Sequence, residues 1–352
     1  MHSNNSHQKQ LENIISKDFI SEDDFQLLIS EKSLPFIEQL AWASRSITLR
    51  RFGKTISLYA PLYLSSYCIN SCKYCGFNVH NRIDRKKLTS SEVRKELAAL
   101  KDEGFRHVLL LTGEAPHITD VSYLKEMVKI SKEHMEHVSI EVFPMSTDEY
   151  SELVKAGCDG VTIYQETYNR DIYKSVHVAG PKKDYDYRYQ TPIRAARASM
   201  KSIGMGFLLG LAPWREEIIE LYRHTHEVMK IDWRARIAVS FPRLRPHEGD
   251  FQVDFPVNDE ELALMIFSLR IAFPDAELVM STRESSSLRD GFIGLGITRM
   301  SAGSSTMVGG YSGSGASLEQ FEIDDSRSPK EISEVITAKG FEPVWKDWDE
   351  SL

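Results

Sequence analysis

From residue 57 onward, the sequence alternates between short runs rich in β-branched residues or leucine and longer amphipathic stretches. This alternation is typical of a parallel sheet whose strands are connected by helices. Eight such runs occur, and eight parallel strands predict a closed (β/α)8 barrel. The expected strands are Ser57–Leu64, His107–Thr112, Val138–Phe143, Gly160–Gln165, Met205–Leu211, Arg236–Phe241, Glu277–Ser281 and Ile297–Ser301.

Helix-start signals divide the chain further. Two connecting helices begin with capping boxes, Thr89-Ser-Ser-Glu92 and Ser146-Thr-Asp-Glu149, in which hydroxyl and carboxylate satisfy each other's orphan amide. Ser21 can cap an acidic first turn, and Pro35 can open a second helix, so the first 50 residues should be helical and separate. We expect an N-terminal helical extension over 1–50, the barrel over 51–320 and a C-terminal segment packed on the barrel over 321–352.

Composition excludes several classes of protein. With 352 residues, of which 41% are hydrophobic, the chain can bury a barrel-sized core. The formal charge of -8 argues against a generic nucleic-acid surface, because phosphate binding needs a concentrated basic face. No apolar run approaches the ~20 residues of a membrane span, and no apolar segment follows Met1. We therefore expect a cytoplasmic protein that does not bind membranes.

Three of the four cysteines are packed into one short segment, as Cys68-Ile-Asn-Ser-Cys72-Lys-Tyr-Cys75. A structural zinc site takes four protein ligands, and iron-sulfur clusters that only transfer electrons generally take four thiolates. The missing fourth ligand therefore predicts a [4Fe-4S] cluster with one open iron. The alternatives are zinc, for which His80 is the only nearby fourth ligand, and a disulfide pair; Cys158 is interpreted as a small core residue.

Polar and charged segments follow several of the expected strands. Because the carboxyl ends of barrel strands meet on one rim, these segments should lie together and suit a polar, zwitterionic ligand. In addition to the cysteine segment they are Thr112-Gly113-Glu114, Tyr164 to Tyr168, Ser240 to Pro246 and Ser281 to Glu284.

The cysteine segment, with the aromatic Tyr74 before its third cysteine, resembles the cluster loop of the radical S-adenosylmethionine enzymes. This resemblance implies that the open iron binds S-adenosylmethionine and that an electron from the cluster cleaves the cofactor to a 5'-deoxyadenosyl radical. Thr112-Gly113-Glu114 resembles the family segment Gly-Gly-Glu, whose backbone and carboxylate accept the cofactor ammonium. A threonine replaces the first glycine here.

Further motifs are similar to those of the 2-iminoacetate synthase family, the tyrosine lyases of thiazole biosynthesis. This resemblance implies cleavage of the Cα–Cβ bond of L-tyrosine to 2-iminoacetate (dehydroglycine) and p-cresol, which supplies the thiazole moiety of thiamin. A related tyrosine lyase of hydrogenase maturation adds cysteines for a second cluster, whereas no cysteine follows Cys158 here, which favours the thiamin branch. A lyase acting on another aromatic amino acid, and a zinc-stabilised binding module, are the alternatives. The motifs are Tyr74 to Phe77, Asn81-Arg82-Ile83, Tyr164 to Tyr168, Ser240 to Pro246, Ser281 to Glu284, Gly309 to Tyr311 and Pro343 to Trp348.

The resemblance also implies roles for two residues at the cofactor. Glu166 can accept a hydrogen bond from its ribose or ammonium, and Arg188 can pair with its carboxylate. A purely structural ion pair between the two is the alternative interpretation.

Other residues are candidates for binding the substrate. Arg283 can take the substrate carboxylate bidentately, and Ser281 can add a hydrogen bond. Arg243 and Arg245 follow the predicted strand Arg236–Phe241, and of the two we expect Arg243, with Ser240, to point toward the substrate. As partners, the resemblance implies a flavodoxin or ferredoxin-type electron donor and the thiazole synthase that consumes the short-lived imine.

Overall fold

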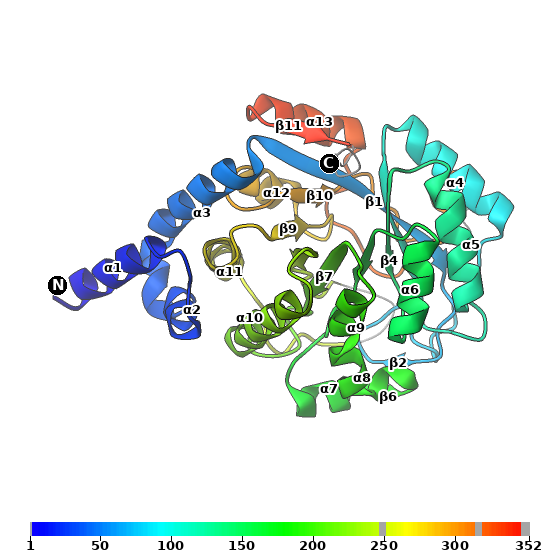
Figure 1. The fold of residues 1–352 in the computed structure, drawn as a ribbon, viewed down its shortest axis with the longest axis horizontal. Helices are drawn as coiled ribbons and strands as arrows, with labels where there is room; N and C mark the ends of the chain where they lie inside the picture. Colours follow the sequence, from blue (N-terminus) through cyan, green and yellow to red (C-terminus); the bar gives the residue numbers. More distant parts are fainter. Residues whose placement is uncertain (1, 246–250, 314–318, 346–352) are drawn as a thin grey trace.

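A closed parallel barrel forms the centre of the computed structural model, which describes residues 2–245, 251–313 and 319–345. Eight strands follow the order β1, β3, β4, β5, β7, β8, β9, β10, and the pairing of β10 with β1 closes the barrel (Figure 1). The predicted (β/α)8 barrel is therefore confirmed. The strands are β1 (Thr55–Ser65), β3 (His107–Thr112), β4 (His137–Glu141), β5 (Gly160–Thr162), β7 (Ser202–Gly206), β8 (Arg236–Ser240), β9 (Glu277–Met280) and β10 (Arg299–Ser301).

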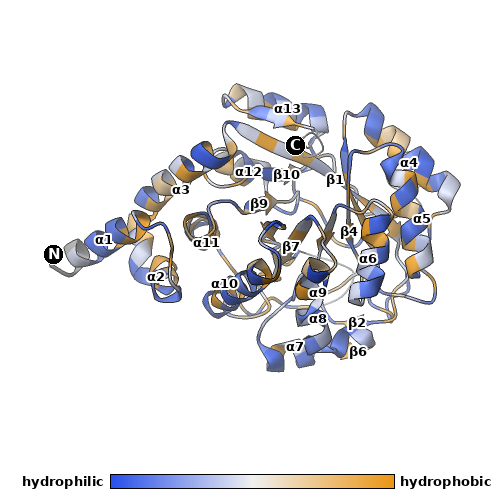
Figure 2. Cartoon of the chain, viewed as in Figure 1, coloured by the Kyte–Doolittle hydropathy of each residue, from blue (hydrophilic) through white to orange (hydrophobic). Residues whose placement is uncertain are grey.

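Helices surround the barrel and turn their apolar sides toward it (Figure 2). Both predicted capping boxes are present. The Thr89 hydroxyl accepts from the backbone amide of Glu92, and the Ser146 hydroxyl accepts from that of Glu149. In each box the glutamate carboxylate accepts in turn from the backbone amide of the cap residue. These starts are predictable because a capping box involves only four consecutive residues. The helices that follow barrel strands are α4 (Ser90–Asp102), α5 (Val121–Lys132), α6 (Thr147–Lys155), α7 (Arg170–Val176), α8 (Tyr185–Tyr189), α9 (Thr191–Arg197), α10 (Trp214–Ile231), α11 (Asp259–Ala272) and α12 (Ser286–Phe292).

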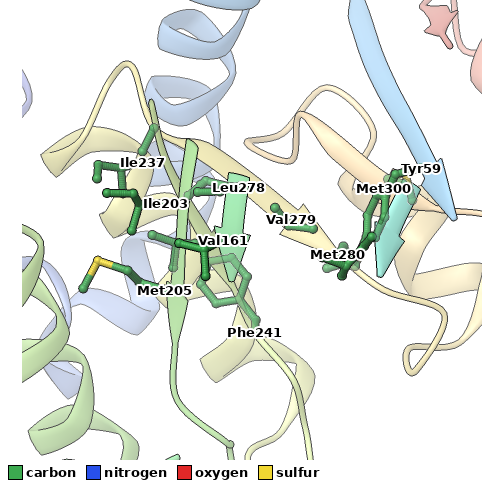
Figure 3. Packing of buried hydrophobic residues seen from close by; sticks show 14 of the residues in the cluster. Tyr59, Val161, Ile203, Met205, Ile237, Phe241, Leu278, Val279, Met280 and Met300 are labelled. Carbon is green, nitrogen blue, oxygen red and sulfur yellow. The ribbon is translucent and has the colours of Figure 1, made fainter. Parts of the chain in front are cut away.

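Strand side chains alternate between the two faces of the barrel wall. Leu109 and Leu111 line a cavity inside the barrel, while Val108 and Leu110, which alternate with them, are fully buried. Figure 3 shows buried side chains of other barrel strands, among them Ile203 of β7 and Leu278 of β9. The wall is thus packed on its outer face and open to a cavity on part of its inner face.

One predicted strand, Met205–Leu211, is wrong in its position, because β7 ends at Gly206. The apolar residues after it do not continue the strand but are buried elsewhere. Leu208 and Leu211 form a small apolar cluster with Cys72, Tyr74 and Val176, beside the cysteine segment. A hydrophobic run alone cannot distinguish these two kinds of burial.

The N-terminal helices pack on the outside of the barrel. They are α1 (His2–Ile15), α2 (Glu22–Leu28), the 3₁₀ helix η1 (Glu31–Phe36), which contains Pro35, and α3 (Ile37–Phe52). The Phe25 ring stacks on Tyr222 of α10 at 4.8 Å, and the Tyr222 hydroxyl donates to the Ile20 carbonyl at 2.6 Å.

The C-terminal segment returns to the beginning of the barrel. It contains α13 (Pro329–Ala338) and β11 (Glu342–Val344), and β11 pairs in parallel with β1 (Figure 1). The Trp345 ring contacts Phe105 edge to face at 5.3 Å, while Trp348 lies outside the described residues. The predicted boundaries of the barrel domain, after residue 50 and after residue 320, stay predictions. Among the described helices, none is both long and apolar enough to cross a membrane.

Candidate active site

A cavity opens where the barrel strands end. Ten of the thirteen predicted site residues line it, although they come from segments far apart in the sequence. They are Cys68, Cys72, Cys75, Tyr74, Thr112, Gly113, Glu114, Glu166, Arg188 and Arg283.

The cysteine segment is fixed by polar side chains that bind its own backbone. Arg85 donates to the carbonyls of Ser66 at 2.6 Å and Phe77 at 3.1 Å, and Asn78 donates to the Cys72 carbonyl at 2.9 Å. The short strand β2 (Ser71–Cys72) also pairs with β6 (His177–Ala179). These bonds hold a loop that has little regular structure of its own.

The three cysteines offer a sulfur donor set toward the cavity. Burial raises the pKa of the Cys72 thiol to about 12 and also raises that of Cys75, so a bound cation has to replace the thiol protons. No three His, Cys, Asp or Glu side chains of the described residues are arranged to hold a single metal ion. His80, the fourth ligand that the zinc alternative requires, is exposed and does not line the cavity. The donor set fits an iron-sulfur cluster better than zinc.

A buried hydrogen-bond chain fixes Tyr74 in the cavity wall. The Tyr74 hydroxyl lies 2.7 Å from Nε2 of His177, whose Nδ1 lies 2.8 Å from the Tyr173 carbonyl. Burial lowers the pKa of His177 to about 3, so its ring is neutral. Nδ1 then carries the ring proton and donates a hydrogen bond to the Tyr173 carbonyl, and Nε2 accepts one from the Tyr74 hydroxyl.

The Thr112-Gly113-Glu114 segment lies directly against the cysteine segment. A Cβ atom on Gly113 would lie 2.3 Å from the Tyr67 carbonyl oxygen, so only glycine fits there. Asn70 donates to the Glu114 carboxylate at 2.6 Å. The Thr112 hydroxyl is buried without a hydrogen-bond partner among the described residues, which leaves it available to a ligand in the cavity.

Glu166 stands in a buried cluster of charges. Lys182 lies 2.6 Å and Arg188 3.0 Å from its carboxylate, and all three residues line the cavity. Burial alone would raise the pKa of Glu166, but the two cations outweigh it and lower the pKa to about 2. The structural ion pair with Arg188 therefore exists, and it faces the cavity, so it does not exclude binding of a cofactor.

A second cavity of about 610 Å³ is lined by residues from inside the barrel. Ser240, Ser281 and Arg283 line it together with apolar side chains such as Leu109 and Leu111. Arg283 lies over the Phe321 ring at 3.4 Å, and within the described chain no carboxylate forms an ion pair with it. The two cavities share part of their lining, namely Glu141, Tyr164, Pro242, Arg283, Gln320 and Phe321.

The prediction for Arg243 is wrong. Arg243 lines neither cavity and donates from Nε to both carboxylate oxygens of Glu284 at 2.9 Å, and from Nη1 to Asp259 at 2.8 Å. Arg245 lines the first cavity instead and pairs with Asp324 at 3.2 Å. Strand β8 ends at Ser240 and Pro242 follows, so strand alternation no longer decides where these arginines point.

Sequence reasoning missed several residues of the site. Glu141 is the last residue of its strand and carries the same signal as the residues found on the other strand ends. Lys182 lies in the 3₁₀ helix η2 (Pro181–Lys183) and Gln320 in an irregular segment, and nothing in the sequence places either in the cavity.

Comparison with known proteins identifies the family. A family model described as "Radical SAM superfamily" matches residues 62–223, and one described as "Biotin and Thiamin Synthesis associated domain" matches residues 240–342. The 2-iminoacetate synthase of Escherichia coli K12 is 39% identical over 343 residues, which cover 97% of this chain and 91% of that protein. This chain belongs to the 2-iminoacetate synthase family.

Other members and neighbours of the 2-iminoacetate synthase family agree with this assignment. The 2-iminoacetate synthase of Salmonella typhimurium LT2 matches with the same identity and coverage. A crystal structure of HydG, a maturase of the [FeFe]-hydrogenase, superposes with a TM-score of 0.92 at 30% identity and covers 97% of this chain and 77% of that one. Radical SAM membership implies an iron-sulfur cluster and S-adenosylmethionine, and the sulfur donors and the adjoining polar cavity fit both.

Proposed function

We propose that this protein cleaves the Cα–Cβ bond of L-tyrosine to 2-iminoacetate and p-cresol, and that the imine supplies the thiazole moiety of thiamin. The observation that carries this proposal is the 39% identity to two 2-iminoacetate synthases over 97% of the chain. The two cavities with a shared lining support it, because the reaction requires a cofactor and a substrate in contact.

The first cavity is the cofactor site in this proposal. Cys68, Cys72 and Cys75 hold a [4Fe-4S] cluster, beside which the cofactor methionine binds. Cluster and cofactor, when bound, supply a 5'-deoxyadenosyl radical that removes a hydrogen atom from the substrate amine. The Glu114 carboxylate accepts from the cofactor ammonium, and Arg188 binds the cofactor carboxylate.

Around the same cofactor, Glu166 accepts a hydrogen bond from the ribose, while Tyr74 contributes to the wall of the site. Thr112 offers its unpartnered hydroxyl, and Gly113 lets the backbone approach closely.

The second cavity is the substrate site. Arg283 binds the tyrosine carboxylate with its fork of donors, and Ser281 adds a hydrogen bond. The apolar lining surrounds the aromatic ring, and Ser240, Ser301 and Thr306 add hydroxyl groups to the wall of this cavity. A site inside the barrel also excludes water, which protects a carbon radical from side reactions.

Two partner proteins belong to the proposal. A flavodoxin or ferredoxin-type protein donates the electron that the cluster needs, and it can approach the cysteine segment where Lys73 and Val79 are exposed. A thiazole synthase consumes the imine. Direct transfer between the two enzymes limits the loss of a product that water hydrolyses.

The decisive experiment is an anaerobic reconstitution with iron and sulfide, followed by dithionite, S-adenosylmethionine and L-tyrosine. We expect 5'-deoxyadenosine, p-cresol and glyoxylate from the hydrolysed imine, and none of them from Cys72→Ser. Deoxyadenosine without p-cresol, followed by product formation when L-tryptophan replaces L-tyrosine in the same assay, would assign the chain to another aromatic amino acid. A protein that binds zinc and forms no deoxyadenosine would contradict the proposal as a whole.

A further inference from the structure

Glu141 is a carboxylic acid inside the barrel. It ends strand β4, and its side chain lines both cavities. Within the described residues, no donor forms a hydrogen bond or ion pair with its carboxyl group. The other acids of the first cavity differ, since Glu166 is held by two cations and Glu114 accepts from Asn70. A partly buried acid that is left unpaired is costly unless a ligand provides its partner.

Arg283 is the corresponding cation of the same space. It also lines both cavities, and its contacts are the face of the Phe321 ring and a long 3.5 Å bond to the Arg243 carbonyl. Glu141 and Arg283 influence each other electrostatically but form no ion pair. A carboxylate and a guanidinium that face one cavity without forming an ion pair leave room for a ligand that carries one positive and one negative group.

We infer that Glu141 binds the α-ammonium group of the amino-acid substrate, opposite Arg283, which binds its α-carboxylate. The pair then forms a clamp for a zwitterion at the junction of the two cavities. This arrangement holds the substrate amine at the side of the cofactor cavity and leaves the second cavity for the aromatic side chain. The inference deepens the proposed function and rests on it for the identity of that side chain.

The electrostatics of the junction make the clamp dependent on pH. Burial raises the pKa of Glu141 to about 7, while Arg283, Arg188 and Lys182 act to lower it and Glu166 acts to raise it. The phenols that face it are neutral near pH 7, because burial raises their pKa values too; they belong to Tyr59, Tyr63 and Tyr164. Glu141 therefore gains its negative charge as the pH rises through about 7, where a substrate ammonium is still protonated.

Binding of two ligands tests the inference on the reconstituted holoenzyme with S-adenosylmethionine. We compare the dissociation constant of L-tyrosine with that of 3-(4-hydroxyphenyl)propanoate, which lacks only the amino group. Wild type should prefer the amino acid, and Glu141→Gln should lose about tenfold or more of that preference. Glu152→Gln, the same change on the exposed side of α6, should keep it. An undiminished preference in Glu141→Gln overturns the inference.

A measurement on the wild type covers the case in which Glu141→Gln fails to fold. The preference for L-tyrosine over its desamino analogue should rise between pH 6 and pH 8, since only the amino acid gains from the ionised carboxylate. A constant ratio over that range overturns the inference. If L-tyrosine yields no p-cresol, the proposed side chain is wrong, and the same pair of tests is run with the amino acid that does support deoxyadenosine formation and its desamino analogue.

Discussion

At the scale of single residues, Arg283 differs from its neighbours because its guanidinium has no acidic partner among the described residues. Replacing it by lysine keeps the positive charge but removes the planar fork that a carboxylate needs. We expect Arg283→Lys to weaken L-tyrosine binding about tenfold or more, with little change in the temperature of unfolding. Calorimetric titration of the holoenzyme measures this. An unchanged dissociation constant would remove Arg283 from the substrate site.

Arg243 should give the opposite result. Its main partner, Glu284, has only 3% of its side chain exposed, so removal of the arginine leaves a buried carboxylate with a reduced set of partners. We expect Arg243→Met to lower the free energy of unfolding by about 3 kcal/mol, with L-tyrosine affinity nearly unchanged in the folded fraction. Denaturant titration and calorimetry separate the two effects. A large loss of affinity at unchanged stability would restore Arg243 to the substrate site.

At the scale of elements, helix α10 fixes the loop after β5. Glu217, in its first turn, accepts from the Tyr168 amide at 2.7 Å, the Thr167 hydroxyl at 2.9 Å and the Asn169 amide at 3.1 Å. The loop contains Glu166, whose φ of 72° is unusual for a residue other than glycine. The anchor thus maintains the strained backbone that directs Glu166 into the cofactor cavity.

We therefore expect Glu217→Ala to raise the KM for S-adenosylmethionine about tenfold, although residue 217 does not line either cavity. The turnover number should change less, because the substrate site is intact. Steady-state kinetics with varied cofactor test this, and Glu220→Ala is the control, as an exposed residue of the same helix. Equal KM values for the two variants would show that α10 does not position the loop.

How far the sequence predicts this molecule depends on the range of the interactions involved. Helix starts such as Thr89 are predictable because the cap is local, and the order of the barrel strands follows from their periodicity. Cys68, Cys72 and Cys75 are found because three ligands share one loop. The prediction fails at Arg243, where the chain leaves its strand, and at Lys182, whose place depends on how the short helix η2 packs against the distant Glu166.

At the scale of the whole molecule, the C-terminal segment completes the barrel. Gln320 and Phe321 line both cavities, and Gln320 lies 3.7 Å from the Cys75 sulfur. Asp325 forms a fully buried ion pair with Arg289, and β11 extends the sheet beside β1. Residues 321–345 therefore contribute to the wall of the site, which predicts that they unfold together with the cluster-binding half of the barrel.

This expectation can be tested at α13, whose Ile336 is fully buried. Truncation to alanine removes about 3 kcal/mol of stability at such a position, because contacts are lost and a cavity remains. In a single cooperative unit, Ile336→Ala lowers the unfolding temperature measured by near-ultraviolet circular dichroism and by loss of cluster absorbance to the same extent. Thr337→Ala, on the exposed side of the same helix, should change neither. If Ile336→Ala lowered the dichroism transition and left the cluster transition at its wild-type temperature, the segment beyond residue 320 would be a separate folding unit.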